Sequence, residues 1–159
     1  MPNLFELEWQ YENDQPPWLV RVARVGAQAG AERLGASVYE IDAGGRASPL
    51  HVHYANEELI VVLSGRPTLR TADGSRELAV GEVVACPVGL RGAHRVENNG
   101  DEPARVLIVS TMIYPEVATH LDSDKVVVLS GPPEQVGEDG VLAAFKRSDA
   151  VAPMEGETA

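Results

Sequence analysis

The chain has 159 residues, of which 44% are hydrophobic, with 15 glycines and 11 prolines. This composition is typical of one globular domain that is rich in turns. The formal net charge of −11 repels phosphate backbones and anionic lipid, so we expect neither nucleic acid nor a membrane as a partner. Cys86 is the single cysteine and no signal-peptide or membrane-span pattern is present, so we expect a cytoplasmic protein without disulfides.

The first 34 residues contain two segments in which apolar and polar residues alternate, residues 5–9 and 18–26, separated by a proline-rich turn. Such alternation predicts strands at the edge of a sheet. We interpret residues 1–34 as N-terminal strands that also serve dimerisation. Trp9 and Trp18 in these segments are expected in the core or at a subunit interface.

Short strand patterns follow from residue 35 to 112, interrupted by glycine, proline and an Asp-Gly hairpin signal. No long helical period separates them, so the pattern predicts an all-β sandwich or barrel. Residues 114–133 are expected to return as an extended strand against the barrel, and the last 20 residues to form a short helix and a tail. The expected organisation is an N-terminal segment, a barrel over residues 35–128, and a C-terminal extension over residues 129–159.

Two of the four histidines, His51 and His53, are one residue apart in a strand pattern. Alternate residues of a strand share a face, so the two imidazoles lie about 7 Å apart along the chain and can converge on one ion. Glu57 and Glu58 stand at the start of the next predicted strand, residues 58–63. The unbroken apolar run of this strand predicts burial on both faces. A carboxylate at the mouth of such a strand is costly unless it is paired or bound to a cation.

A third histidine, His94, begins a later strand pattern, and closure of a small barrel would bring it to the same interior wall. Three histidines and one carboxylate suit a divalent transition metal rather than calcium or magnesium. His120 is interpreted as an ordinary polar residue, and Cys86 as a small buried hydrophobe.

Two sequence motifs carry a resemblance to a known family. The first reads Gly45-x5-His51-x-His53-x4-Glu58-x6-Gly65, and the second reads Gly81-x5-Pro87-x-Gly89-x4-His94-x3-Asn98. Both resemble the motifs of the cupin superfamily, the first in full. In the second, four residues stand between Gly89 and His94 where two are usual, so a loop at the barrel mouth is longer by two residues within Leu90–Gly92.

The resemblance implies a double-stranded β-helix, or jelly roll, with the metal ligands His51, His53, Glu58 and His94. The six-residue gap to Gly65 selects Glu58, and Glu57 is the second choice. With Glu58 inward, Ile60 and Val62 are expected to line the pocket. Cupins commonly dimerise, so we expect a homodimer, and we expect substrate specificity to depend on the lengthened loop.

Three neutral imidazoles and one carboxylate leave a divalent ion with a net charge of +1, which favours an anionic or oxygen-chelating small molecule. We therefore expect a metal-dependent oxygenase, isomerase or lyase that acts on an organic acid or a sugar-like molecule, using iron, manganese, nickel or zinc. Glu57 and Tyr39 are the candidate acid/base groups. The alternative is a binding or sensing protein without turnover, since few other titratable groups are available.

Overall fold

The computed structural model describes residues 1–133 and 135–158. The regular structure of these residues is almost entirely β-strand, together with one α-helical turn, α1 (Val25–Gln28), and two 3₁₀ turns, η1 (Leu90–Gly92) and η2 (Arg147–Asp149). The strands are β1 (Tyr11–Asn13), β2 (Val20–Ala23), β3 (Leu34–Ile41), β4 (His51–His53), β5 (Glu58–Ser64), β6 (Thr68–Arg70), β7 (Ser75–Glu77), β8 (Val83–Cys86), β9 (Arg95–Glu97), β10 (Ala104–Thr111), β11 (Glu116–His120), β12 (Lys125–Leu129) and β13 (Leu142–Lys146). The prediction of an all-β jelly roll is confirmed.

The strands are arranged in three hydrogen-bonded sheets. A six-stranded sheet has the order β1-β2-β3-β10-β5-β8, a four-stranded sheet has the order β13-β12-β11-β4, and a three-stranded sheet has the order β7-β6-β9. All the pairings are antiparallel. Isolated bridges from His51 to His94 and from Arg46 to Glu97 connect the chain around β4 with the second half of the barrel.

The main core fills the barrel between the sheets. Its fully buried side chains include Ile60 and Val62 of β5, Val106 of β10 and Val96 of β9. The opposite face of β5 is less covered than the apolar run predicts, since Leu59 is 40% exposed. Alternation is therefore present in β5, although every residue from 59 to 63 is apolar, because the outer face of the sheet is only partly covered.

A second apolar cluster covers the outer face of the six-stranded sheet. It contains Ala23, Val25 and Val38, against which Leu4, Leu7 and Trp9 pack. The expectation of a strand over residues 5–9 is wrong, because the Asn3 side chain accepts the amide N–H of Phe5 at 2.9 Å and starts a turn there. The alternation in this segment reflects packing on the sheet, and β1 begins only at Tyr11.

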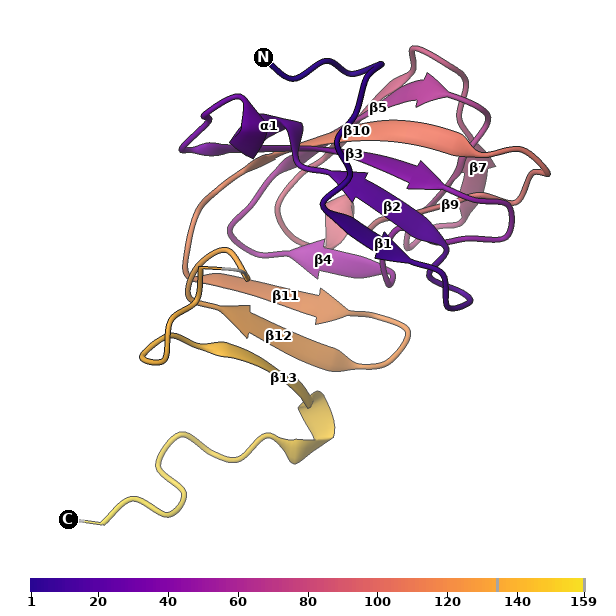
Figure 1. Ribbon diagram of the computed structural model, residues 1–159. Helices are drawn as coiled ribbons and strands as arrows, with labels where there is room; N and C mark the ends of the chain where they lie inside the picture. The colour runs from indigo at the N-terminus through magenta and orange to yellow at the C-terminus, as the bar shows by residue number, and fades with distance from the viewer. Residues whose placement is uncertain (134, 159) are drawn as a thin grey trace.

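The C-terminal part of the chain adds strands to the barrel. Residues 114–133, expected as one strand, contain β11 and β12, and β11 pairs with β4 beside the predicted metal ligands. Strand β13 is exposed at all five positions, and the chain beyond η2 extends away from the body of the molecule (Figure 1). No helix in the described ranges is long and apolar enough to span a membrane.

Candidate metal centre

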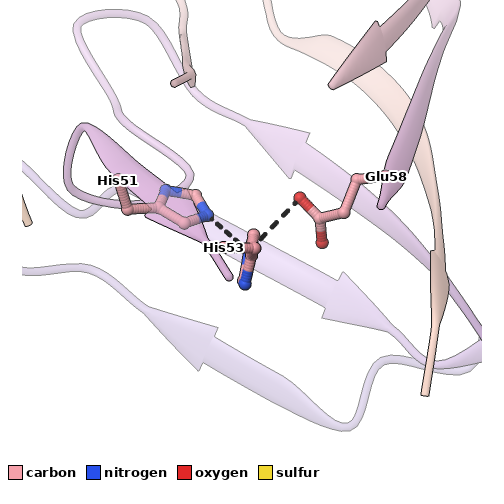
Figure 2. A group of neighbouring side chains, drawn as sticks. All are labelled: His51, His53 and Glu58. Carbon is pink, nitrogen blue, oxygen red and sulfur yellow. Dashed lines mark hydrogen bonds and ion pairs between the residues drawn. The ribbon is translucent and has the colours of Figure 1, made fainter. Parts of the chain in front are cut away.

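Strand β4 positions two of the predicted ligands. His51 and His53 project to the same side of the strand, and Val52, which projects to the other side, is fully buried. The Nε2 atoms of the two histidines are 2.9 Å apart. Figure 2 shows His53 between His51 and Glu58, which approaches from β5. The ligand atoms of these three residues all lie within 4.8 Å of one another, so the group can hold a metal ion.

His94, the fourth predicted ligand, lies beside this group of three. Its Nε2 is 2.8 Å from Oε2 of Glu58, and its ring centroid is 4.4 Å from that of His51. The ring centroids of His94 and His53 are farther apart, at 6.2 Å. The bridge between His51 and His94, in which each amide N–H donates to the other residue's carbonyl, fixes the two backbones side by side.

The separations fit donors around one ion. Two ligand atoms that lie about 2.1 Å from a metal and at right angles to each other are about 3.0 Å apart. The distances of 2.9 Å between His51 and His53 and 2.8 Å between His94 and Glu58 are close to this value. Nε2 of His53 and Oε2 of Glu58 are 3.6 Å apart. Nitrogen donors with one carboxylate are the donor set of transition metals.

Backbone carbonyls fix the orientation of two of the imidazoles. Nδ1 of His51 donates to the carbonyl of Pro49 at 2.9 Å, and Nδ1 of His94 donates to the carbonyl of Gly92 at 2.9 Å. A carbonyl only accepts, so these Nδ1 atoms carry protons and the Nε2 atoms face the site.

Buried Nδ1 of His53 finds no hydrogen-bond partner among the described residues. Without a metal, the Nε2 proton of His53 donates to His51, and the lone pair of Nδ1 then faces the Glu116 carboxylate 3.8 Å away. Two acceptors facing each other in a buried site are unfavourable. A cation at Nε2 moves the proton to Nδ1 and removes this conflict, so the residues fit a bound metal.

The surroundings shift the pKa values of the predicted ligands in different directions. Burial, together with the neighbouring histidines, lowers the pKa of His51 to about 3, so His51 is neutral and ready to ligate at physiological pH. Burial also acts to lower the pKa of His94, but hydrogen bonds to Cys86 and Glu58 outweigh it and raise the pKa to about 10. Burial acts to raise the pKa of Glu58, and the His94 hydrogen bond with the nearby imidazoles lowers it below its usual value.

Two cavities meet at this cluster. The smaller, of about 180 Å³, is lined by all four predicted ligands and by Tyr39. The larger, of about 810 Å³, shares Tyr39, His53, Glu58 and Ile108 with it. The larger cavity is lined by the inner faces of β3 and β10, by residues 24–34 around α1, and by the β12–β13 connection. The predicted ligands therefore lie at the wall of a space that admits a small molecule.

Comparison with known proteins identifies the fold family. Residues 37–110 match the family described as cupin domain. The barrel is a cupin domain. The resemblance predicted from the two motifs is thereby confirmed. No curated protein sequence matches the chain significantly.

Solved structures share the fold of this cupin over almost its whole length. A cupin-superfamily sugar phosphate isomerase from Silicibacter pomeroyi is 23% identical, covers 93% of each chain and superposes with a TM-score of 0.78. A protein from Acidithiobacillus ferrooxidans, provisionally assigned the same activity, is 21% identical and covers 92% of this chain and 88% of its own, with a TM-score of 0.76. A polyketide cyclase from Streptomyces resistomycificus is 22% identical and covers 70% and 78%, with a TM-score of 0.56. At these identities the likeness shows the shared fold.

The remaining predicted residues of the cupin site lie in different places. Tyr39 of β3 lines both cavities. Glu57 is exposed and lines neither, because it precedes Glu58 in the chain and faces the other way. His120 is half-buried opposite His51 in the β11–β4 pair and lines neither cavity. Cys86 is buried in the core.

Two expectations about the pocket walls of the cupin barrel need correction. Ile60 and Val62 face inward like Glu58, but they belong to the core below the cavities and line neither of them. The lengthened loop forms η1, in which Leu90 is 64% exposed, and residues 90–93 also line neither cavity. The loop turns outward, and its buried residue, Gly92, supports His94 from behind instead.

Sequence reasoning missed Glu116, the first residue of β11. Its side chain is 4% exposed, lines the larger cavity and lies 3.8 Å from His53. No motif marks it, because an acidic residue at the start of a strand is usually solvated. Arg24 and Gln135, in the N-terminal segment and the C-terminal extension, also line this cavity and were equally unmarked.

Proposed function

We propose that the protein is a metal-dependent enzyme that acts on a small sugar-like molecule or organic acid, as an isomerase or lyase. The observation that carries this proposal is the joint position of the His51, His53, Glu58 group and Tyr39 on the wall shared by two cavities. A titratable hydroxyl next to a cation site is what proton transfer at a polarised carbonyl requires. The two structures that match over most of this chain, both assigned to sugar phosphate isomerases, support the sugar-like class.

The substrate class follows from charge and size. His51, His53, His94 and Glu58 would hold a divalent ion and leave it with one net positive charge, which attracts an anionic or chelating oxygen ligand. A bound ion of this kind polarises a carbonyl or hydroxyl oxygen of the substrate. The larger cavity, of about 810 Å³, is in the range of small-molecule sites, so a molecule of monosaccharide size is admitted.

In this proposal the side chains of the protein divide the work. The histidines and Glu58 would bind the ion, and the Tyr39 phenol would transfer the proton at the substrate carbon. Glu57, the other acid/base candidate, is exposed and lines neither cavity, so we assign the proton transfer to Tyr39 alone. The backbone carbonyls of Pro49 and Gly92 keep His51 and His94 oriented throughout.

A non-catalytic binding or sensing protein is the second candidate. The inner faces of β3 and β10 present mainly small, hydroxyl and apolar side chains to the larger cavity, including Ser37, Ile108 and Ser110. Such walls can hold a ligand without assisting chemistry. Turnover, or its absence, therefore decides between the two candidates.

Metal content and turnover test the proposal together. Purified protein would be analysed for iron, manganese, nickel and zinc, and then screened for aldose–ketose interconversion, elimination and oxygen uptake with small sugars and organic acids. Interconversion or elimination without oxygen uptake supports the proposal. Iron with substrate-dependent oxygen uptake would instead identify an oxygenase, and tight ligand binding without turnover would identify a binding protein.

Variants locate the activity in the site. His51→Ala should lose most of the bound metal, whereas His120→Ala should keep it, because His120 lies outside the ligand group. Tyr39→Phe should keep the metal and the substrate affinity but lower kcat by about 10²-fold or more, the usual contribution of general acid/base catalysis. An unchanged kcat in Tyr39→Phe would exclude it as the proton-transfer group.

We also propose a cytoplasmic homodimer. Its support is the open edge of the four-stranded sheet, where β13 is exposed throughout and presents Leu142 and Phe145 at 53% and 43% exposure. Exposed apolar edge strands favour pairing with a second copy. Light scattering at micromolar concentration tests this, and a monomer there would refute it.

A further inference from the structure

The third imidazole of the proposed metal centre lacks the support that the other two have. His51 and His94 each donate Nδ1–H to the carbonyl two residues earlier in the chain. For His53 that carbonyl belongs to His51, and it already accepts the amide N–H of His94 at 3.0 Å across the bridge. The backbone therefore offers His53 no equivalent partner, and Nδ1 stays buried without a hydrogen bond.

The group that faces this nitrogen is a carboxylate. Oε1 of Glu116 lies 3.8 Å from Nδ1 of His53. Strand β11, which Glu116 begins, pairs with β4 and places Ala118 opposite His53. The side chains of Glu116 and His53 are thereby brought together from neighbouring strands, and both line the larger cavity.

Glu116 is itself held firmly in place. Oε1 accepts the amide N–H groups of Tyr54 and Ala55 at 3.0 and 3.3 Å, and Oε2 accepts the side-chain amide of Asn56. Glu116 is only 3% exposed. A buried carboxylate with three donors is oriented before any ligand binds, so its direction toward His53 does not depend on a flexible side chain.

We infer that Glu116 is a positioning residue of the metal centre: its carboxylate faces Nδ1 of His53, favours the proton on that nitrogen and so keeps Nε2 available to the metal. This inference rests on the proposed metal centre. A carboxylate behind a ligating histidine fixes the tautomer and raises the basicity of the ligand nitrogen. In this chain two ligands receive that support from the backbone and the third from Glu116, which lies outside the matched cupin segment 37–110.

If Glu116 only anchored residues 54–56, the expected effect of its replacement on metal binding would be different. Glu116 also anchors residues 54–56, so its replacement will reduce stability in either case. Asn56 provides the matched control, because its side chain bonds Glu116, Thr111 and Ile113 but does not face His53. Asn56→Ala therefore damages the same loop but keeps the carboxylate, whose Oε1, the oxygen that faces Nδ1, still accepts the amides of Tyr54 and Ala55.

The test is metal affinity of the full-length protein. Apo protein would be titrated with Zn²⁺ and with Mn²⁺ in competition with a chelator, for wild type, Glu116→Gln and Asn56→Ala. We expect Glu116→Gln to bind 10- to 100-fold more weakly, the usual effect of removing such a partner, and Asn56→Ala to stay within about threefold of wild type. Equal weakening in both variants, or none in Glu116→Gln, would overturn the inference and leave the metal centre intact.

A second measurement uses the wild-type protein and does not depend on how a variant folds. In the Zn²⁺-loaded protein, ¹H–¹⁵N correlation of the histidine rings should show a proton on Nδ1 of His53 that exchanges slowly with water. A metal bound through Nδ1, or a proton there that exchanges as fast as in a solvated imidazole, would contradict the inference. Failure of wild type to bind either metal would refute the proposed metal centre and the inference together.

Discussion

Gly92 is the position where a single methyl group is expected to disturb both the barrel and the proposed metal site. A Cβ atom at this residue would lie 1.7 Å from the carbonyl oxygen of Pro87, and 2.8 Å from two further backbone atoms of Pro87. Real Cβ contacts are essentially never shorter than 3.0 Å, so the two backbone segments must separate by at least the difference, 1.3 Å. Because the opposing atoms are backbone, no side chain can move aside instead.

The size of the effect follows from this geometry. Overpacking of a buried site costs typically 1–3 kcal/mol, and a clash between two backbone segments belongs at the upper end, at about 3 kcal/mol. For a chain of this length we expect Gly92→Ala to lower Tm by about 6–12 °C. The carbonyl of Gly92 also accepts Nδ1–H of His94, so the shift should weaken metal binding by about tenfold or more.

Thermal unfolding of the apo protein and chelator-competition titrations measure the two effects. Gly137→Ala is the matched control, because no atom lies within 4 Å of its added Cβ, and it should change neither Tm nor metal affinity. A Gly92→Ala protein that melts within about 2 °C of wild type and binds metal equally well would show that the packing of η1 on Pro87 does not position His94.

Three further measurements check the core, a charge cluster and the site. The pKa of His94 is raised to about 10, so below that pH a metal must displace the proton of His94 in order to bind. Chelator competition should therefore show metal affinity rising about tenfold per pH unit, or about 100-fold from pH 6.5 to 8.5. An affinity that does not change with pH would contradict this. Ile60 is 0% exposed, and Ile60→Ala should lower the free energy of unfolding, measured in urea, by about 3–4 kcal/mol. Leu59 on the opposite face is 40% exposed, and Leu59→Ala should lower it by only about 1 kcal/mol. Equal losses in the two variants would refute the assigned faces of β5. Burial acts to raise the pKa of Glu40, but hydrogen bonds from Arg21 and Arg105 lower it below its usual value. The stabilisation from ionised Glu40 is therefore present above the unfolded pKa near 4.5 and is lost as pH falls through the lower folded value. Glu40→Gln should reduce the dependence of the free energy of unfolding on pH in that acidic window.

The local sequence predicted much of the barrel because strand formation depends on near neighbours. The alternation from residue 35 to 112 and the Asp-Gly hairpin predicted strands that the structure contains, β6 and β7 among them. Residues 5–9 show where this reasoning fails. Their alternation of apolar and polar residues indicates that one side of the segment is buried. A segment that packs on the outer face of a sheet without joining it buries one side just as a strand does.

The direction of the β5 side chains also could not be read from the local pattern of apolar residues. An unbroken run from Leu59 to Leu63 carries no period, so the run itself could not tell which side chains face the core, and only the motif spacing to Gly65 favoured Glu58. The structure decides it through the pairing of β5 with β10 and β8, which directs Ile60 and Val62 inward with Glu58. Burial of the other face depends on what covers the sheet, and only part of it is covered.

By itself the sequence determined the all-β class, the cupin motifs and, through the resemblance that these motifs carry, His51, His53, Glu58 and His94 as candidate ligands, because these depend on residue type and on spacing along the chain. Only the tertiary structure decided that Glu116 faces His53, that Glu57 points away, and that parts of the N-terminal segment and of the β12–β13 connection, rather than the lengthened loop, join β3 and β10 in the walls of the larger cavity. The reason is physical. Which residues oppose one another across a barrel depends on strand pairing and closure, and residues 53 and 116 meet only because β11 returns to pair with β4.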